Sequence, residues 1–199
     1  MKIIGLCGQS GAGKTTALEV FAKEGFGIID CDKVSREVCS PGSQCVLELK
    51  ERFGDRIVNA NGVLDRRALA DIAFSDPERL VALNSITHTY IIERVLEHAS
   101  ELEREGFRAI VIDAPVLFES GLDKKCDVTV AVLAEKEKRI ERIIKRDGIS
   151  RERAALRIER QLGEKELISL ADEAIYNNED EAQFAKCVEK LARKIGEKL

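Results

Sequence analysis

Four short apolar runs, separated by longer stretches of helical periodicity, dominate the hydrophobic pattern of this chain. The runs cover residues 2–7, 26–30, 108–113 and 126–132, and runs of this kind are typical of strands buried in a parallel sheet. Between them, apolar side chains recur at spacings of three and four residues, which indicates amphipathic helices. A fifth, edge strand is expected within residues 170–178, before a final helix with an apolar stripe. The pattern predicts an α/β fold with three layers, α/β/α, around a five-stranded parallel sheet.

Composition and charge exclude several classes of protein. With 199 residues, 44% hydrophobic and 34% charged, the chain is expected to form one domain with a sizeable core. A formal net charge of −4 argues against a dedicated nucleic-acid binder. No apolar run approaches the length of a membrane span and no signal peptide is recognised, so we expect a cytoplasmic protein without a membrane partner. The six cysteines form no Cys-x-x-Cys pair and are assigned no function.

Residues 8–15 match Gly-x-x-x-x-Gly-Lys-[Ser/Thr], the phosphate-binding P-loop. The first apolar run precedes them and a helical pattern follows, an order that argues against an accidental glycine-rich turn. The glycines leave the backbone amides open to phosphate oxygens, Lys14 adds a positive charge for the β- and γ-phosphates, and the Thr15 hydroxyl can ligate Mg²⁺. The residues expected to bind a nucleoside triphosphate are Gly8, Gly11, Ala12, Gly13, Lys14, Thr15 and Thr16.

Three aspartates, Asp30, Asp32 and Asp113, lie at or just after the ends of apolar runs. The carboxyl ends of parallel strands meet at one edge of a sheet, so all three are expected at the edge that carries the P-loop. One carboxylate there can accept the proton of an acceptor hydroxyl, and we favour Asp32 for this role. Asp30 or Asp113 can hold Mg²⁺ through water. For Asp30, capping of the following helix is an equally good alternative.

About 70 residues between the second and third runs contain no convincing strand. We interpret this region as a helical insert that binds the acceptor; a purely structural insert is the alternative. His88 lies within it and is a candidate for substrate binding, although a lone histidine on a helix is more often a surface or interior group. The expected parts of the single domain 1–199 are a nucleotide-binding core at about 1–35, 105–142 and 170–199, the insert at about 36–104, and a lid at about 143–169.

Positive charge concentrates in residues 136–165, which hold eleven Lys/Arg and six Asp/Glu. Arg139, Arg142 and Arg146 share one face of a predicted helix. Arginine grips several phosphate oxygens at once, and we assign this role to Arg142 and Arg146, whereas the remaining arginines are expected to form a solvated face. The neighbouring isoleucines Ile140, Ile143 and Ile144 are expected to pack on the sheet. The break at Asp147-Gly148 allows the helix from about Ser150 to move as a lid.

Together these features resemble the dephospho-coenzyme A kinases along nearly the whole chain. Besides the P-loop, the similar pieces are Asp30-Cys31-Asp32, Pro115–Glu119, Arg142–Asp147, Gln161 and residues 171–178. The chain departs from the family at Gln9, where a second glycine is usual, and at Cys7, where threonine is usual. A His-Pro pair of the family appears here as His88-Thr89.

The resemblance implies a P-loop kinase that transfers the γ-phosphate of ATP to the ribose 3′-hydroxyl of dephospho-coenzyme A, the last step of coenzyme A biosynthesis. It implies that Asp32 accepts the hydroxyl proton and that Lys14, Arg142 and Arg146 offset charge on the transferring group. ATP and Mg²⁺ are the expected cofactors, and the small-molecule substrate is the expected partner of a monomer or small homo-oligomer.

Three other functions are alternatives on the sequence alone. Another P-loop small-molecule or nucleoside-monophosphate kinase would share the P-loop, the acidic residues and the arginine-rich segment. A GTP-dependent switch would normally carry an Asn-Lys-x-Asp motif, which is absent from the sequence. A P-loop ATPase acting on nucleic acid fits the acidic balance and small size less well.

Overall fold

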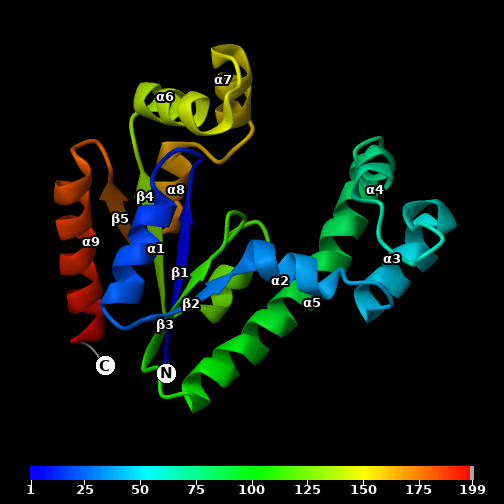
Figure 1. The fold of residues 1–199 in the computed structure, drawn as a ribbon, viewed down its shortest axis with the longest axis horizontal. Helices are drawn as coiled ribbons and strands as arrows, with labels where there is room; N and C mark the ends of the chain where they lie inside the picture. Colours follow the sequence, from blue (N-terminus) through cyan, green and yellow to red (C-terminus); the bar gives the residue numbers. More distant parts are fainter. Residues whose placement is uncertain (198–199) are drawn as a thin grey trace. The chain divides into compact units, whose positions relative to one another are not determined.

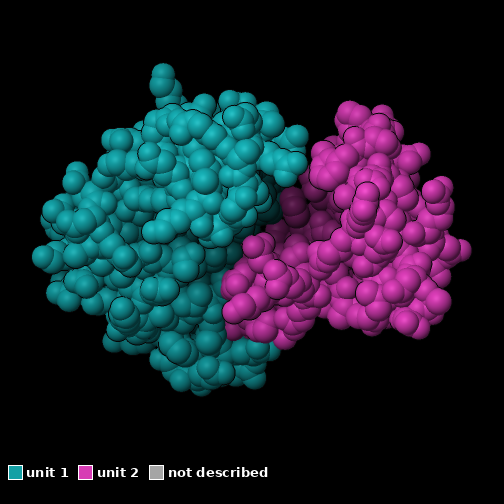
Figure 2. Space-filling model, turned by 45° about the horizontal axis from the view of Figure 1, so that its top comes forward, with its two compact units in different colours: residues 1–29, 101–199 teal, residues 30–100 magenta. Residues whose placement is uncertain are grey.

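The computed structural model describes residues 1–197, and Figure 1 shows its strands and helices in sequence order. The chain divides into two compact units, drawn in different colours in Figure 2. Unit 1 comprises Met1–Ile29 and Glu101–Leu199, and unit 2 comprises Asp30–Ser100. Unit 2 overlaps most of the helical insert that was expected at about 36–104.

Unit 1 contains a five-stranded parallel sheet, as predicted, with strand order β2-β3-β1-β4-β5. Its strands are β1 (Lys2–Gly8), β2 (Gly27–Asp30, which runs to the unit boundary), β3 (Ala109–Asp113), β4 (Val128–Leu133) and β5 (Glu173–Tyr176). The predicted edge strand is β5, which pairs only with β4 among the described strands. In the register of β1 with β3, Leu6 lies opposite Asp113, so the end of β3 is delivered to the start of the P-loop.

Alternate residues of the central strands pack against helices α1 (Lys14–Lys23) and α9 (Glu181–Gly196). This core contains Ile4 and Leu6 of β1 together with the predicted apolar stripe of α9: Phe184, Val188, Leu191 and Ile195. On the opposite face, a Cβ on Gly5 would come within 2.9 Å of Leu117 and Cys126, so the segment after β3 lies close against β1. The short 3-10 helix η2 (Leu122–Lys125) lies within that segment and contacts β1, and helix α8 (Glu164–Leu170) contacts β4.

The isoleucines of α6 (Lys136–Asp147) do not pack on the sheet, contrary to the sequence expectation. Ile140 and Ile143 form a separate cluster with Ala154 and Ile158 of α7 (Arg151–Glu159), and Ile144 lies against the same cluster. Gly148 adopts a left-handed conformation at the end of α6, and the Ser150 side chain caps α7. The turn between them thus returns α7 onto α6, and the two helices bury each other's apolar faces.

Unit 2 is helical, with one isolated bridge between Val58 and Leu64 among its described residues. Its elements are α2 (Cys31–Val38), α3 (Gln44–Phe53), η1 (Asp55–Ile57), α4 (Arg66–Ala73) and α5 (Pro77–Arg104), which continues into unit 1. Its core is formed by Cys39, Cys45, Val46, Leu49, Ile57 and Leu69. The sequence Ser75–Glu78 is a helix-start signal, and α5 begins within it at Pro77. No helix within residues 1–197 has the length and apolar character needed to cross a bilayer.

Candidate active site

The P-loop connects β1 directly to α1, as the sequence predicts. Its backbone turns through left-handed conformations at Gly11 (φ +78°) and Gly13 (φ +106°), which non-glycine residues rarely adopt. A Cβ on Gly11 would come within 2.7 Å of the Arg139 carbonyl oxygen, so helix α6 approaches the loop too closely for any larger residue. Gly13 occupies the N-cap position of α1, and the amides of this helix start form an anion-binding site.

Replacement of Gly13 by alanine should destabilise the fold. A Cβ there would come within 2.1 Å of the Asn177 amide nitrogen, which donates to the Ala12 carbonyl at 2.9 Å. Backbone strain and the displaced buried hydrogen bond together should lower the free energy of unfolding by roughly 2–4 kcal/mol, measured by urea denaturation. Gly25→Ala is the matched control, because Gly25 also has a positive φ (+87°) but has no neighbour within 4 Å of its added Cβ. Equal losses in both variants would contradict the steric explanation.

Lys14 and Asp113 lie together at the end of the central strands. Lys14 is the first residue of α1, and its Nζ donates to Asp113 Oδ1 at 2.5 Å. Both side chains are mostly buried, with relative exposures of 17% and 19%. Asp113 therefore holds the Lys14 ammonium beside the glycine loop, in the position where the β- and γ-phosphates of a bound nucleotide would be expected.

Arg142 contacts the P-loop, as its predicted role requires. It extends from α6, and its Nη1 donates to the Gly11 carbonyl at 3.2 Å. Its Nη2 donates to the Asn177 main-chain carbonyl at 3.0 Å and to the Asn177 side-chain oxygen at 3.3 Å. Asn177, which follows β5 and is 7% exposed, completes this connection through its bond to Ala12. Asn177 was not predicted as a contact of the loop, although its position after an expected strand end was a usable signal.

Arg146 is paired with an acidic neighbour instead of the P-loop. Its Nε and Nη2 donate to the two carboxylate oxygens of Asp147 at 2.7 and 3.0 Å, and Arg157 of α7 also donates to Asp147. The hydrogen bonds from Arg146, followed by those from Arg157, lower the pKa of Asp147 to about 2. The Arg146 side chain is 60% exposed, so a bound phosphate would have to draw it away from a solvated ion pair.

Arg139 was predicted to lie on a solvated face, and this prediction is wrong. The residue is 4% exposed, and its guanidinium contacts the P-loop at Gln9 and at the Ser10 carbonyl. Helical periodicity correctly placed Arg139 on the same face as Arg142. It did not reveal that the P-loop covers this face of α6.

Asp30 and Asp32 have different environments at the start of α2. Asp30 caps the helix, because its Oδ1 accepts from the amides of Asp32 and Lys33 at 2.9 and 3.1 Å. The capping alternative for Asp30 is therefore confirmed. Asp32 is exposed in the first turn, and its carboxylate has no hydrogen-bond or ion-pair partner within residues 1–197. This leaves the Asp32 carboxylate able to accept a proton from a bound alcohol.

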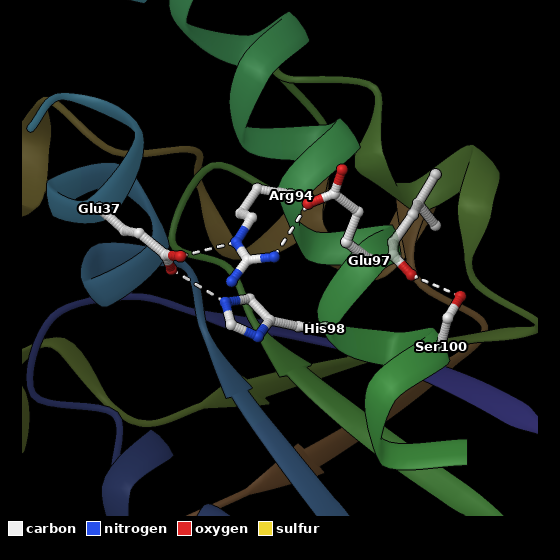
Figure 3. A network of polar contacts seen from close by, with 6 residues as sticks. Glu37, Arg94, Glu97, His98 and Ser100 are labelled. Carbon is white, nitrogen blue, oxygen red and sulfur yellow. Dashed lines mark hydrogen bonds and ion pairs between the residues drawn. The ribbon is translucent and has the colours of Figure 1, made fainter. Parts of the chain in front are cut away.

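A polar network in unit 2 fixes α2, which carries Asp32, to α5, which carries the half-buried His88 (Figure 3). Glu37 of α2 accepts from Arg94 Nε at 2.7 Å and lies 2.9 Å from His98 Nε2. The hydrogen bond to His98, followed by that to Arg94, lowers the pKa of Glu37. Arg94 also bonds Glu97 of its own helix at 2.9 Å. These contacts hold the helix that presents Asp32 in a defined orientation within the unit.

The oxygen donors near the P-loop suit a magnesium ion that is held mainly by the nucleotide. Mg²⁺ in kinases usually keeps several waters and binds one or two protein oxygens together with substrate phosphates. Thr15 offers an exposed hydroxyl in the first turn of α1, and Asp113 offers a carboxylate at the end of β3. Groups of three or more His, Cys, Asp or Glu able to hold a metal are absent from residues 1–197.

Comparison with known proteins identifies the family. The family model for dephospho-CoA kinase matches residues 2–183. The dephospho-CoA kinase of Fusobacterium nucleatum is 38% identical over 97% of this chain and 98% of that protein, and the Corynebacterium glutamicum enzyme is 38% identical over 88% and 90%. The solved dephospho-CoA kinase from Campylobacter jejuni superposes with a TM-score of 0.72 at 27% identity and covers 98% of both chains. The chain therefore belongs to the dephospho-CoA kinase family.

Proposed function

We propose that this chain transfers the γ-phosphate of ATP to the ribose 3′-hydroxyl of dephospho-coenzyme A, giving coenzyme A and ADP. The observation that carries the proposal is the P-loop with its Lys14–Asp113 pair, in a chain whose family match extends over residues 2–183. The same match favours this acceptor over the nucleoside monophosphates of related P-loop kinases. ATP use follows from the kinase family, and Mg²⁺ is the metal that Thr15 suits.

On binding of ATP, Lys14 would exchange part of its contact with Asp113 for the β- and γ-phosphate oxygens. The amides from Gly8 to Thr16 would surround the same phosphates. Thr15 would bind Mg²⁺, and Asp113 would hold the ion through water once Lys14 turns toward the phosphates. Asp30 is the poorer alternative for this role, because its Oδ1 already accepts two backbone amides. Bound Mg²⁺ supplies positive charge that offsets the charge of the phosphates.

Arg142 and Arg146 would stabilise negative charge on the transferring group in different ways. Arg142 is already held against the loop by Gly11 and Asn177, so its guanidinium needs little rearrangement. Arg146 would have to leave Asp147, which links its use to movement of the predicted lid at 143–169. Exclusion of water by such a movement would protect ATP from hydrolysis.

Asp32 would accept the proton of the 3′-hydroxyl as that oxygen attacks the γ-phosphorus, because its carboxylate is exposed and unpaired among the described residues. His88 would contact the acceptor from α5. We place the reaction in the cytoplasm, in agreement with six free cysteines, and expect a monomer or small homo-oligomer.

An acceptor panel tests this function. The protein is incubated with Mg-ATP and, separately, dephospho-coenzyme A, AMP, CMP and shikimate, and ADP release is followed by a coupled assay. Among these acceptors, we expect only dephospho-coenzyme A to raise ADP release well above the ATPase background. Each ADP formed should correspond to one phosphate added to dephospho-coenzyme A. Release of ADP with a nucleoside monophosphate, and none with dephospho-coenzyme A, would refute the proposal.

A further inference from the structure

Gln9 is a buried polar residue inside the P-loop. Its side chain is 6% exposed, and both ends of its amide are bonded. The Nε2 atom donates to the Leu162 carbonyl at 2.7 Å, whereas the Oε1 atom accepts from Arg139 Nη1 at 2.6 Å. Gln9 therefore joins the P-loop to helix α6 on one side and to the segment that follows α7 on the other.

Arg139 is an almost fully buried cation that lies against the same part of the loop. Its Nε donates to the Ser10 carbonyl at 3.1 Å, and its Nη2 is buried without a hydrogen-bond partner. Among the described residues, no carboxylate forms an ion pair with Arg139. Burial lowers the pKa of this guanidinium, and the charge of Glu164 acts in the opposite direction. An unpaired buried charge is costly to the fold, so an apolar side chain would serve better if packing were its only purpose.

A third contact holds the same two residues of the loop. The backbone amide of Ser10 donates to Gln161 Oε1 at 2.9 Å. Gln9 and Ser10 are thus bonded through both side-chain and backbone atoms to α6 and to residues 161–162. Residues 161–162 follow α7 and lie within the predicted lid at 143–169. Hydrogen bonds therefore connect the P-loop to the segment at the end of α7.

We propose that Gln9 and Arg139 act as a pair of positioning residues for ATP: they hold the P-loop in its phosphate-binding shape, tie it to the end of α7, and add positive charge beside the phosphate site. The inference rests on the proposed nucleotide site. The charge of Arg139 acts through the low-dielectric interior of the loop, where it is screened less than an exposed charge would be. The pair should therefore affect ATP affinity much more than affinity for the acceptor.

A double-mutant cycle of Arg139→Met and Gln9→Ala tests the pair. Kd for ATP is measured by calorimetry without acceptor, below the Tm of every variant, and KM for dephospho-coenzyme A is measured separately. Loss of hydrogen bonds to a charged group should raise the Kd of Arg139→Met about tenfold or more, and Gln9→Ala should raise it about three- to tenfold. The double variant should lose less than the product of the two single losses, because the hydrogen bond between Arg139 Nη1 and Gln9 Oε1 is removed by either substitution. KM for the acceptor should stay within about twofold in all three.

A conservative variant of Arg139 and two variants of exposed residues serve as controls. Arg139→Lys, which keeps the charge but not the planar fork, should recover part of the affinity lost in Arg139→Met. Arg153→Met and Gln183→Ala alter exposed residues of α7 and α9 and should leave the Kd for ATP unchanged. A merely structural role would lower Tm in the cycle variants without changing their Kd.

Unchanged ATP affinity in the folded variants, or losses that simply multiply in the double variant, would overturn the inference. If Arg139→Met does not fold, the Kd of Gln9→Ala for ATP tests the inference, since this variant retains Arg139. Failure of the proposed function has a different signature, because the wild-type protein would then bind ATP and release no ADP with dephospho-coenzyme A.

Discussion

Asp32→Asn should leave ATP binding nearly intact and reduce turnover by ~10²–10⁴-fold, the usual contribution of a general base. The amide has the size of the carboxylate but cannot take the proton from the 3′-hydroxyl. Asp30, not Asp32, caps α2, so the substitution should not disturb the helix. Turnover is measured by ADP release at saturating dephospho-coenzyme A, and ATP affinity is measured by calorimetry in its absence.

Asp71→Asn is the matched control for this prediction. Asp71 is also an exposed aspartate on a helix of unit 2, and its substitution should leave turnover unchanged. Wild-type turnover in Asp32→Asn would remove Asp32 from the mechanism. Lost ATP affinity in that variant would instead assign Asp32 to the nucleotide site.

Lys14→Met should reduce turnover by ~10²–10³-fold, the typical cost of removing one preorganised charge or donor from a transition state. The Lys14 ammonium is held at the P-loop by Asp113 at 2.5 Å, and methionine can fill its volume without its charge. ATP affinity should fall in the same variant, because the β-phosphate loses its ammonium partner in the ground state as well. Steady-state kinetics and nucleotide titration measure the two effects.

The substitution also leaves the Asp113 carboxylate without its cation. Repulsion between this carboxylate and the phosphates of ATP is a separate explanation for lost activity. The double variant Lys14→Met/Asp113→Asn removes that charge and should remain at least as impaired as Lys14→Met, since Asp113 is also proposed to hold Mg²⁺. Recovery of activity in the double variant would contradict a direct role for Lys14. Lys50→Met is the control, since Lys50 also pairs with an aspartate, Asp55 at 2.9 Å, in an exposed part of unit 2.

The sequence predicted those parts of the fold and site that depend on local pattern. Short apolar runs gave the strands of the parallel sheet, and the glycine spacing gave the P-loop between β1 and α1. The rule that parallel strands end at one edge of a sheet correctly brought Asp113 to Lys14. Arg142 was assigned to phosphate binding from its helix face and its planar fork, and its contact with the Gly11 carbonyl is compatible with that prediction.

Contacts between distant segments could not be predicted in the same way. The burial of Arg139 depends on the close approach of Gly11 to α6, and periodicity defines a helix face without naming its neighbour. For the same reason, Ile140 and Ile143 were assigned to the sheet although α7 covers them. Asp30 had two good uses on the sequence alone, capping and metal binding, and capping is shown only by the hydrogen bonds that its side chain accepts from the amides of Asp32 and Lys33.

The proton acceptor is tested most directly by a crystal structure with ADP, Mg²⁺ and dephospho-coenzyme A bound. We predict that an Asp32 carboxylate oxygen lies within hydrogen-bond distance, ~2.6–3.2 Å, of the ribose 3′-oxygen. The same oxygen should face the end of the ADP phosphates that Lys14 contacts. An acceptor bound in this orientation with the Asp32 carboxylate turned away from its 3′-hydroxyl would contradict the mechanism.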